Sequence, residues 1–177
     1  MDKLNLTSTS ERLAFRALEP EDLSWLMLLE NDPAHWLVGE RQLPLSRSTF
    51  KAYIENASET LQEAGQFRWV IELRESNTPI GLLDLYNYSE RNQRSAVGVL
   101  VHLDHRNKGY AKEALNWLSD YAREVAFLHQ LYAEIQSDNE HSIDLFTNAG
   151  YAKTGVLKDW LRRRNAFVDV VQMQLIL

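Results

Sequence analysis

The 177-residue sequence contains no cysteine, so disulfide bonds, thiolate nucleophiles and cysteine-ligated zinc sites are excluded. It has no apolar run near the roughly 20 residues that a membrane-spanning helix needs. Residues 1–11 are polar and do not resemble a secretory signal. Lysine and arginine (19) are outnumbered by aspartate and glutamate (25), so the basic surface that nucleic acid requires is missing. These absences favour a soluble cytoplasmic protein with neither nucleic acid nor a membrane as its partner.

No repeat, low-complexity tract or Gly/Ser-rich linker divides the chain, and we expect residues 1–177 to form a single domain. Hydrophobic residues make up 45% and charged residues 25%, which is ordinary for a globular protein. The net charge of −6 is compatible with a cationic substrate, although mild acidity also serves solubility alone. The sequence leaves open whether the protein forms a homo-oligomer.

Hydrophobic spacing predicts alternating strands and helices along the chain. In order, these are strand 13–18, a helix opened by residues 19–22, a helix from 46 or 48 through 61, strands 67–73, 80–88 and 95–102, helix 109–126, strand 131–136, helix 142–148, and strands 156–161 and 166–176. This order is typical of a mixed α/β (α+β) fold with a mostly antiparallel central sheet flanked by helices. Residues 96–101 are almost wholly apolar, as expected of a strand buried on both faces.

The most informative segment joins this apolar strand to the next helix through a polar turn. The first backbone N–H groups of a helix have no internal partner and lie at the positive end of its dipole, so they favour phosphate. Gly109 lets the backbone approach a bulky anion, and Ala111 keeps the next contact small. Arg106 and Lys108 add positive charge nearby. The segment therefore predicts a phosphate site at the start of the helix.

Residues 106–111 read Arg-Asn-Lys-Gly-Tyr-Ala and match the loop pattern Arg/Gln-x-x-Gly-x-Gly/Ala, so the chain here resembles the GCN5-related N-acetyltransferase (GNAT) family. Residues 139–151 resemble a second block of that family, Asn-x-x-Ser-x-x-Leu-Tyr/Phe-x-x-x-Gly-Phe/Tyr. Residues 13–23 are similar to its usual opening strand and helix. The short loop pattern arises often by chance, but the two blocks in this order and context are specific. The alternative is another α/β fold in which Gly109 starts a helix and Gly150 ends one.

The resemblance implies the GNAT acyltransferase fold and acetyl-coenzyme A (acetyl-CoA) as acetyl donor, without a metal. In the family the pantetheine arm of the coenzyme lies in a gap between two central strands, here beside Val99 to Leu103. Its pyrophosphate lies on the loop, and an asparagine at the position of Asn139 bonds the arm or nearby backbone. Carried over residue by residue, the predicted coenzyme site comprises Val101, His102, Leu103, Arg106, Asn107, Lys108, Gly109, Tyr110, Ala111, Lys112, Asn139, Ser142 and Phe146.

Direct transfer of an acetyl group to an amine needs a base that takes the ammonium proton. Many relatives carry a glutamate for this on the strand that is 96–101 here, but this sequence has no carboxylate there. The remaining candidates are Asp84 and Glu134 on the neighbouring strands, of which we favour Asp84. Each is equally well explained as a strand residue that faces solvent.

The reaction also needs an acid, or solvent, to protonate the leaving thiolate. Phe146 stands where many relatives have a tyrosine, and phenylalanine cannot donate a proton. Tyr151, Tyr110 or Tyr86 could replace that tyrosine, and solvent or a substrate proton could also suffice. Because of this difference from the family pattern, a non-catalytic coenzyme-binding domain remains an alternative.

The overall pattern is similar to the branch that holds spermidine/diamine and ribosomal-protein N-acetyltransferases, which implies a primary amine as acceptor. We favour a small polyamine-like amine over a protein or peptide N-terminus. Acidic and aromatic residues between the first two helices suit a cationic amine, although a solvated loop also explains them. These residues are Glu30, Asp32, His35, Trp36 and Glu40.

Two further features have ordinary interpretations. His102 and His105 lack other ligands in a recognisable frame, so no metal site is predicted. The basic run 162–165 is expected to form the tip of the C-terminal hairpin, where an acidic partner could still dock.

Overall fold

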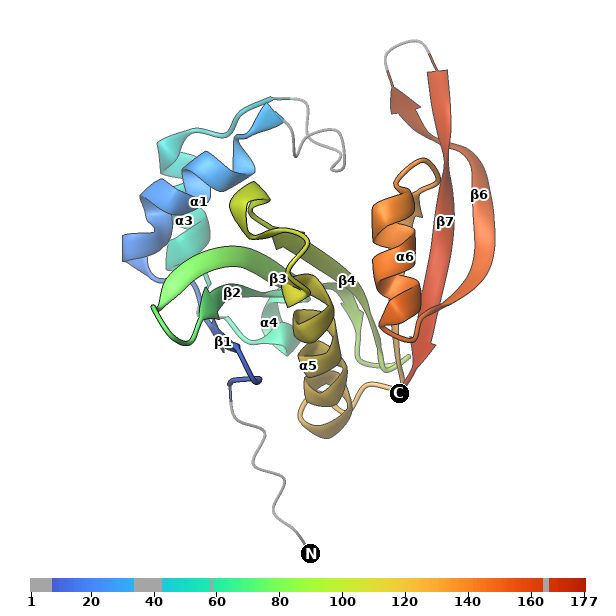
Figure 1. Cartoon of the computed structure of the whole chain (residues 1–177), viewed down its shortest axis with the longest axis horizontal. Coiled ribbons are helices and arrows are strands. Elements are labelled where there is room, and N and C mark those ends of the chain that lie inside the picture. The colour runs from blue at the N-terminus through green and yellow to red at the C-terminus, as the bar shows by residue number, and fades with distance from the viewer. Residues whose placement is uncertain (1–7, 34–42, 58, 164–165) are drawn as a thin grey trace, which may run out of the picture.

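In the part of the chain that the structure describes, seven strands form one sheet in the order β1-β2-β3-β4-β5-β7-β6 (Figure 1). The computed structural model describes residues 8–33, 43–57, 59–163 and 166–177. Every neighbouring pair of strands is antiparallel except β4 and β5, which are parallel. The mixed, mostly antiparallel sheet is therefore confirmed. The strands are β1 (Leu13–Arg16), β2 (Phe67–Leu73), β3 (Thr78–Ser89), β4 (Arg94–Val101), β5 (Gln130–Gln136), β6 (Ala152–Arg163) and β7 (Ala166–Ile176).

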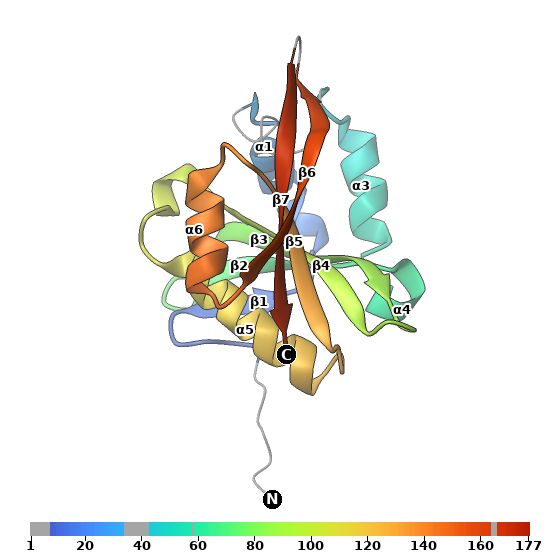
Figure 2. The same cartoon turned by 90° about the vertical axis from the view of Figure 1, so that its right-hand side faces the viewer.

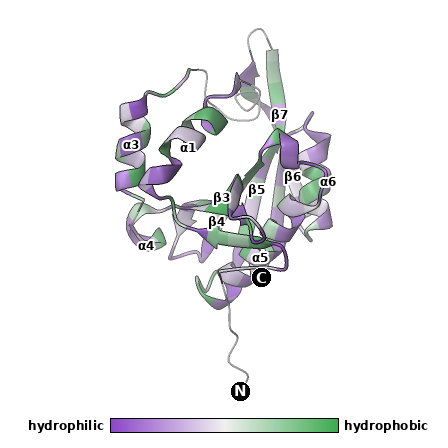
Figure 3. Cartoon of the chain, turned by 60° about the vertical axis from the view of Figure 1, so that its left-hand side comes forward, coloured by the Kyte–Doolittle hydropathy of each residue, from purple (hydrophilic) through white to green (hydrophobic). Residues whose placement is uncertain are grey.

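Helices cover both faces of this sheet (Figures 1 and 2). The helical elements are η1 (Pro20–Asp22), α1 (Leu23–Glu30), α3 (Arg47–Glu55), α4 (Leu61–Ala64), η2 (Leu103–His105), α5 (Tyr110–Glu124) and α6 (Glu140–Asn148). The apolar stripe of α5, with Leu115 and Leu118 fully buried, packs on one face together with Phe146 of α6. Leu26 of α1 and Phe50 of α3 pack on the other face against Val70 and Leu82. The hydropathy colouring shows α3 with hydrophobic and hydrophilic stretches side by side, as such a surface helix requires (Figure 3).

The helix predicted from residue 46 or 48 through 61 is wrong in its length, because the segment forms two helices. Ser46 caps α3 by accepting a hydrogen bond from the Thr49 N–H, and the helix ends at Glu55. Thr60 and Glu63 then form a reciprocal capping box that starts α4. Gly65 ends α4 with φ 67°, a conformation that glycine adopts without strain. A second start signal inside the predicted helix therefore breaks it.

The sheet opens between its two central parallel strands. β4 and β5 pair only from Arg94 opposite Gln130 to Ala96 opposite Tyr132, although both strands continue beyond that point. Residues 98–100 of β4 are half-buried as a result, so the expectation of a strand buried on both faces fails for its second half. Strands that stop pairing leave backbone groups without a ladder partner, and a ligand can use them. The gap positions the candidate site.

The C-terminal hairpin is longer than its pattern predicts. β6 begins at Ala152 and runs through Arg163, with Arg162 opposite Phe167 and Arg163 opposite Ala166 of β7. These two arginines therefore belong to a strand and not to the hairpin tip. Arg164 and Asn165 lie outside the described residues, as do His35, Trp36 and Glu40 of the predicted acceptor region.

Candidate active site

The predicted phosphate loop forms the N-terminus of α5. Gly109 is the N-cap, with φ 81°, and Asn107 also has a positive φ of 60°. No side chain caps the helix, and its first backbone hydrogen bond runs from the Glu113 N–H to the Gly109 carbonyl. The N–H groups of Tyr110, Ala111 and Lys112 are thus left for an outside acceptor. The geometry fits a phosphate group, because the N–H groups and the helix dipole act at the same point.

The basic side chains of the loop bond to its own backbone. Arg106 Nε donates to the Val101 carbonyl at 2.9 Å, and Lys108 Nζ donates to the Asp104 carbonyl at 2.9 Å. Both contacts fold a side chain back over the turn between β4 and α5. They shape the turn, and the positive charge that these two residues add beside the anion stays a prediction. His102 closes the same turn by accepting a hydrogen bond from the Asp104 N–H at 3.4 Å.

Backbone groups of β4 point alternately toward β3 and toward the gap. The His102 N–H donates to the Ile80 carbonyl of β3, and Leu100 and Gly98 occupy the same side of the antiparallel ladder. The N–H and C=O groups of Val99 and the N–H of Val101 consequently point to the gap beside β5, while the Val101 carbonyl accepts from Arg106 Nε. This arrangement offers an extended ligand the edge of a strand, as the predicted pantetheine site requires. Leu103, next along the chain, is exposed on η2.

The second sequence block forms α6 and the chain that leads into it. Asn139 is the N-cap, and its Oδ1 accepts from the Ser142 N–H at 3.1 Å. The predicted asparagine therefore uses its side-chain oxygen on nearby backbone. Phe146 is buried and packs edge-on against Tyr151, with ring centroids 5.0 Å apart. Phe146 is a core residue here, so its ring contributes shape and no proton.

The two candidate bases lie on one face of the sheet, on either side of the gap. Asp84 of β3 pairs with Gly98 of β4, and a Cβ added to Gly98 would lie 3.4 Å from Asp84 Oδ2. The pairing of β4 with β5 ends at Ala96 and Tyr132, but alternation along each strand keeps Gly98 on the face of Ala96 and Glu134 on the face of Tyr132. Asp84, Gly98 and Glu134 therefore form a row on one face of the sheet, with the gap between Gly98 and Glu134. Asp84 is half-buried and Glu134 is exposed.

Arg68 of β2 is the charged residue at this site that pattern reasoning missed. Its Nε and Nη2 bind the two carboxylate oxygens of Asp84 at 2.6 and 3.0 Å, and its Nη1 binds Glu30 of α1 at 2.5 Å. Its guanidinium lies 5.5 Å from the centroid of the Tyr53 ring. Burial alone would lower the pKa of Arg68, but the Asp84 carboxylate raises it overall. The available signal was Arg68 among the apolar residues of the first part of β2, with Asp84 as the charged residue of β3 directly opposite it.

A cavity of about 270 Å³ opens beside this ion-pair network. Its polar lining consists of the Tyr53, Arg68, Asp84 and Tyr86 side chains and of Gln66. It is a polar hollow next to Gly98, at the side of the sheet that carries α1 and α3. A small polar molecule that occupies it would meet both a carboxylate and aromatic rings.

The tyrosines weighed as proton donors lie in three different settings. Tyr86 lines the polar cavity and approaches Gly98 on the same face as Asp84. Tyr110 lies under the guanidinium of Arg12 at the start of α5. Tyr151 is buried in the core, where burial raises the pKa of its hydroxyl. Of the three, only Tyr86 is brought to the row of candidate bases.

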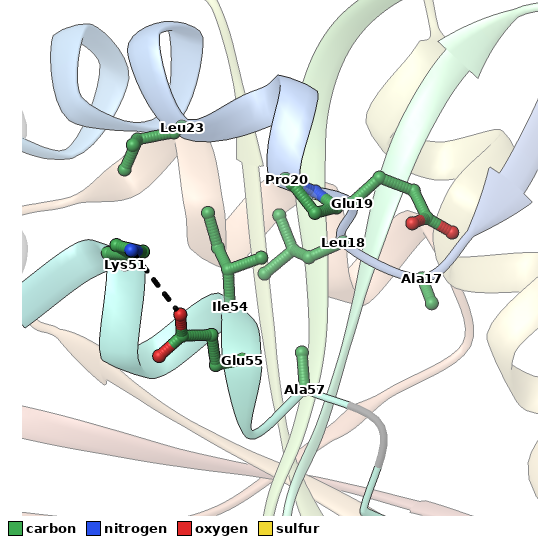
Figure 4. Close-up of a pocket in the computed structure, with 9 residues that line it drawn as sticks. All are labelled: Ala17, Leu18, Glu19, Pro20, Leu23, Lys51, Ile54, Glu55 and Ala57. Carbon is green, nitrogen blue, oxygen red and sulfur yellow. Dashed lines mark ion pairs between the residues drawn. The ribbon is translucent and has the colours of Figure 1, made fainter.

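A larger, mostly apolar cavity of about 400 Å³ lies between η1, the start of α1 and the end of α3 (Figure 4). Leu18, Ile54 and Leu23 contribute its walls, and Lys51 and Glu55 form an ion pair across 3.7 Å at its edge. None of the predicted site residues lines it. This cavity is therefore separate from the candidate site.

The described residues contain neither a metal-binding cluster nor a membrane-spanning helix. No cluster of three or more histidine, aspartate or glutamate side chains there could hold a metal ion. No helix in the same part of the chain is both long and apolar enough to span a bilayer.

Comparison with known sequences identifies one domain family and several relatives. The sequence model of the acetyltransferase (GNAT) domain matches residues 12–152. An uncharacterized N-acetyltransferase, p20, of Bacillus licheniformis is 26% identical over 170 residues, covering 96% of each chain. The spermidine N(1)-acetyltransferase of Vibrio cholerae is 22% identical over 170 residues, covering 94% of each chain.

Solved structures show the same fold. The crystal structure of spermidine N-acetyltransferase from Vibrio cholerae in complex with CoA and spermine superposes with a TM-score of 0.85 at 22% identity, covering 94% of this chain and 96% of that one. An acetyltransferase of the same domain family from Bacillus anthracis gives a TM-score of 0.81 at 18% identity, covering 95% and 96%. The fold of this chain is thus a known architecture.

Proposed function

Because the chain belongs to the acetyltransferase (GNAT) family, we propose that this N-acetyltransferase moves an acetyl group from acetyl-CoA directly to the primary amine of a small, polyamine-like metabolite. The observation that carries the proposal is the uncapped N-terminus of α5 at the end of the gap between β4 and β5. The uncapped helix N-terminus suits a pyrophosphate, and the gap suits an extended pantetheine arm. The turn between β4 and α5 connects the two features.

Different residues at the gap bind different parts of acetyl-CoA. The N–H groups of Tyr110 to Lys112 hold the pyrophosphate, and the strand edge at Val99 and Val101 holds the pantetheine arm. Acetyl-CoA supplies an acetyl thioester, and the amine nitrogen attacks its carbonyl carbon. A backbone N–H of β4 that reaches the thioester oxygen stabilises the charge that develops on it, an effect worth a few kcal/mol.

Asp84 is the proposed base. It lies beside Gly98, where β4 has no side chain to separate the carboxylate from the gap. Arg68 holds both of its oxygens and keeps the carboxylate at a fixed position in the row. Glu134, across the gap, is the competing base. Tyr86 is the nearest phenol to that row and is a candidate for returning a proton to the thiolate.

The acceptor proposal rests on charge and on the relatives. Asp84 and Tyr53 line the cavity with a carboxylate and an aromatic ring, and Glu30 adds a second carboxylate next to Arg68, which suits an ammonium group. The relative from Vibrio cholerae is named for spermidine, so spermidine is the first acceptor to test. Arg68 compensates part of this negative charge, so the panel of acceptors includes amines with fewer charges than spermidine.

Release of free thiol from acetyl-CoA, measured with and without each acceptor, tests this function. The panel comprises spermidine, spermine, monoamines, amino acids and short peptides with a free N-terminus. We expect thiol release that depends on a small amine and an acetylated amine detectable by mass spectrometry. Release with peptides alone would assign the N-terminal acetyltransferase alternative. Tight coenzyme binding without release with any acceptor would assign a non-catalytic coenzyme-binding domain.

A further inference from the structure

Arg12, at the edge of β1, is remote from the phosphate loop in sequence but contacts it in the fold. Its Nη1 donates to the Lys108 carbonyl at 2.9 Å, and its guanidinium lies 4.7 Å from the centroid of the Tyr110 ring. A Cβ added to Gly109 would lie 3.4 Å from its Nη2. One side chain therefore contacts the carbonyl, the glycine and the aromatic ring of three consecutive loop residues.

Glu113, in the first turn of α5, fixes Arg12 in this place. Its carboxylate accepts hydrogen bonds from the Arg12 N–H, from Arg12 Nε and from the Ser10 hydroxyl, each at 2.7 Å. Burial alone would raise the pKa of Glu113, but these hydrogen bonds lower it, so the carboxylate stays charged near neutral pH. An acidic side chain in the first turn of a helix also interacts favourably with the helix dipole.

Contacts from outside the loop help to decide its conformation. Asn107 and Gly109 both have positive φ, and no side chain caps α5. Glycine adopts this conformation freely and asparagine at modest cost, so the sequence permits it and the contacts of Arg12 favour it. The Arg12 side chain is 45% exposed, so its ion pair contributes little to global stability. Its effect is therefore concentrated on the local shape of residues 107–110.

We propose that Arg12 is a positioning residue for the coenzyme. Together with Glu113, it holds the loop in the conformation that presents the N–H groups of Tyr110, Ala111 and Lys112 to the pyrophosphate. The inference rests on the proposed function, because the loop is a coenzyme site only if the protein binds acetyl-CoA. Arg12 acts through the loop and touches neither the thioester nor the acceptor. Its loss should therefore weaken coenzyme binding and leave acceptor binding intact.

Calorimetric titration with coenzyme A tests the proposal on the full chain. We expect Arg12→Ala to raise the dissociation constant about tenfold, which corresponds to about 1.4 kcal/mol. Arg12→Lys keeps the charge but loses the planar fork of donors, so it should recover only part of this loss. In steady-state kinetics the KM for acetyl-CoA should rise in parallel, while the KM for the acceptor changes less than about twofold.

Arg74→Ala is the matched control. Arg74 Nη1 donates to the Ser10 and Glu11 carbonyls at 2.9 and 3.0 Å, so it tethers the same N-terminal segment, and none of its hydrogen bonds reaches the loop. We expect this variant to bind coenzyme A as the wild type does. Equal weakening by Arg74→Ala and Arg12→Ala would overturn the proposal, since the tether alone would then explain the effect. Wild-type affinity in both Arg12 variants would overturn it as well.

Two further measurements distinguish the ways in which the proposal can fail. Thermal unfolding without coenzyme checks that each variant is folded, and Arg12→Lys decides the question if Arg12→Ala does not fold. If the wild type itself fails to bind coenzyme A, the proposed function and the positioning role are both wrong. If the wild type binds and the Arg12 variants bind equally well, only the positioning role is wrong.

Discussion

Gly109 combines two properties that can be tested separately, its backbone conformation and its place in the loop. Because the φ of Gly109 is 81°, any residue with a Cβ would strain the backbone there. The added Cβ would also lie close to Arg12 Nη2. Gly109→Ala should lower the free energy of unfolding by about 1 kcal/mol and weaken coenzyme A binding. Gly65 has a similar φ of 67° at the end of α4, with open space around it. Gly65→Ala should therefore cost similar stability and leave coenzyme affinity unchanged, and equal affinity in both variants would contradict the phosphate loop.

The base assignment is also a question of single residues. Asp84→Asn should lower kcat by about 100-fold or more, the usual effect of losing a general base, and leave the KM for acetyl-CoA unchanged. Glu134→Gln is the matched variant, because Glu134 lies in the same row across the gap. It should change kcat by less than about threefold. The opposite pattern of kcat values would assign the base to Glu134.

At the scale of elements, an ion-pair network joins β1 to η1 and predicts a pH dependence of stability. Arg16 binds both oxygens of the buried Asp22 at 2.6 and 2.8 Å, and the Glu19 N–H donates to the same carboxylate. Burial alone would raise the pKa of Asp22, but the hydrogen bonds from Arg16 and Glu19 lower it. The unfolded chain therefore takes up the proton first as the pH falls. The stabilisation by Asp22 is complete above about pH 5 and is lost progressively below it.

Urea unfolding of Asp22→Asn at pH 7 and at low pH measures this contribution. At pH 7 the variant should lose about 2 kcal/mol, the cost of a lost charge-assisted hydrogen bond to a buried group. The difference from the wild type should shrink as the pH approaches 3. Asp120→Asn is the control, because Asp120 pairs with Arg123 in an exposed position and should contribute less than about 0.5 kcal/mol. A loss from Asp22→Asn that is equal at both pH values would contradict the sign of its pKa shift.

Local patterns predicted most elements, and long-range pairing accounts for what they missed. The apolar stripe of α5 and the alternation in β1 depend on residues close in sequence, so periodicity is enough to find them. The meeting of Arg68 with Glu30 and Asp84 depends on strand register and on the docking of α1, which no local pattern encodes. Arg12 and Glu113 are 101 positions apart and meet for the same reason. The capping box at Thr60 indicates the start of α4, but the longer apolar pattern that runs through this segment obscures it.

At the scale of the whole molecule, the gap in the sheet unites the two sequence blocks. The loop before α5 follows β4 along the chain and so lies on one side of the gap. Asn139 follows β5, on the other side of the gap. The apolar run 96–101 indicated a buried strand, but it could not indicate where pairing with β5 stops. That point depends on how β5, β7 and α6 pack together, and therefore on the complete fold.

NMR-detected amide exchange with and without coenzyme A tests most directly that this gap and loop bind the coenzyme. Slower exchange is predicted at Val99 and Val101, whose N–H groups point to the gap, and at Tyr110 to Lys112 on the loop. Gly98 and Leu100 should change little, because their N–H groups already bond to β3. Equal protection along all of β4, or protection elsewhere in the sheet with none at the loop, would contradict the coenzyme site.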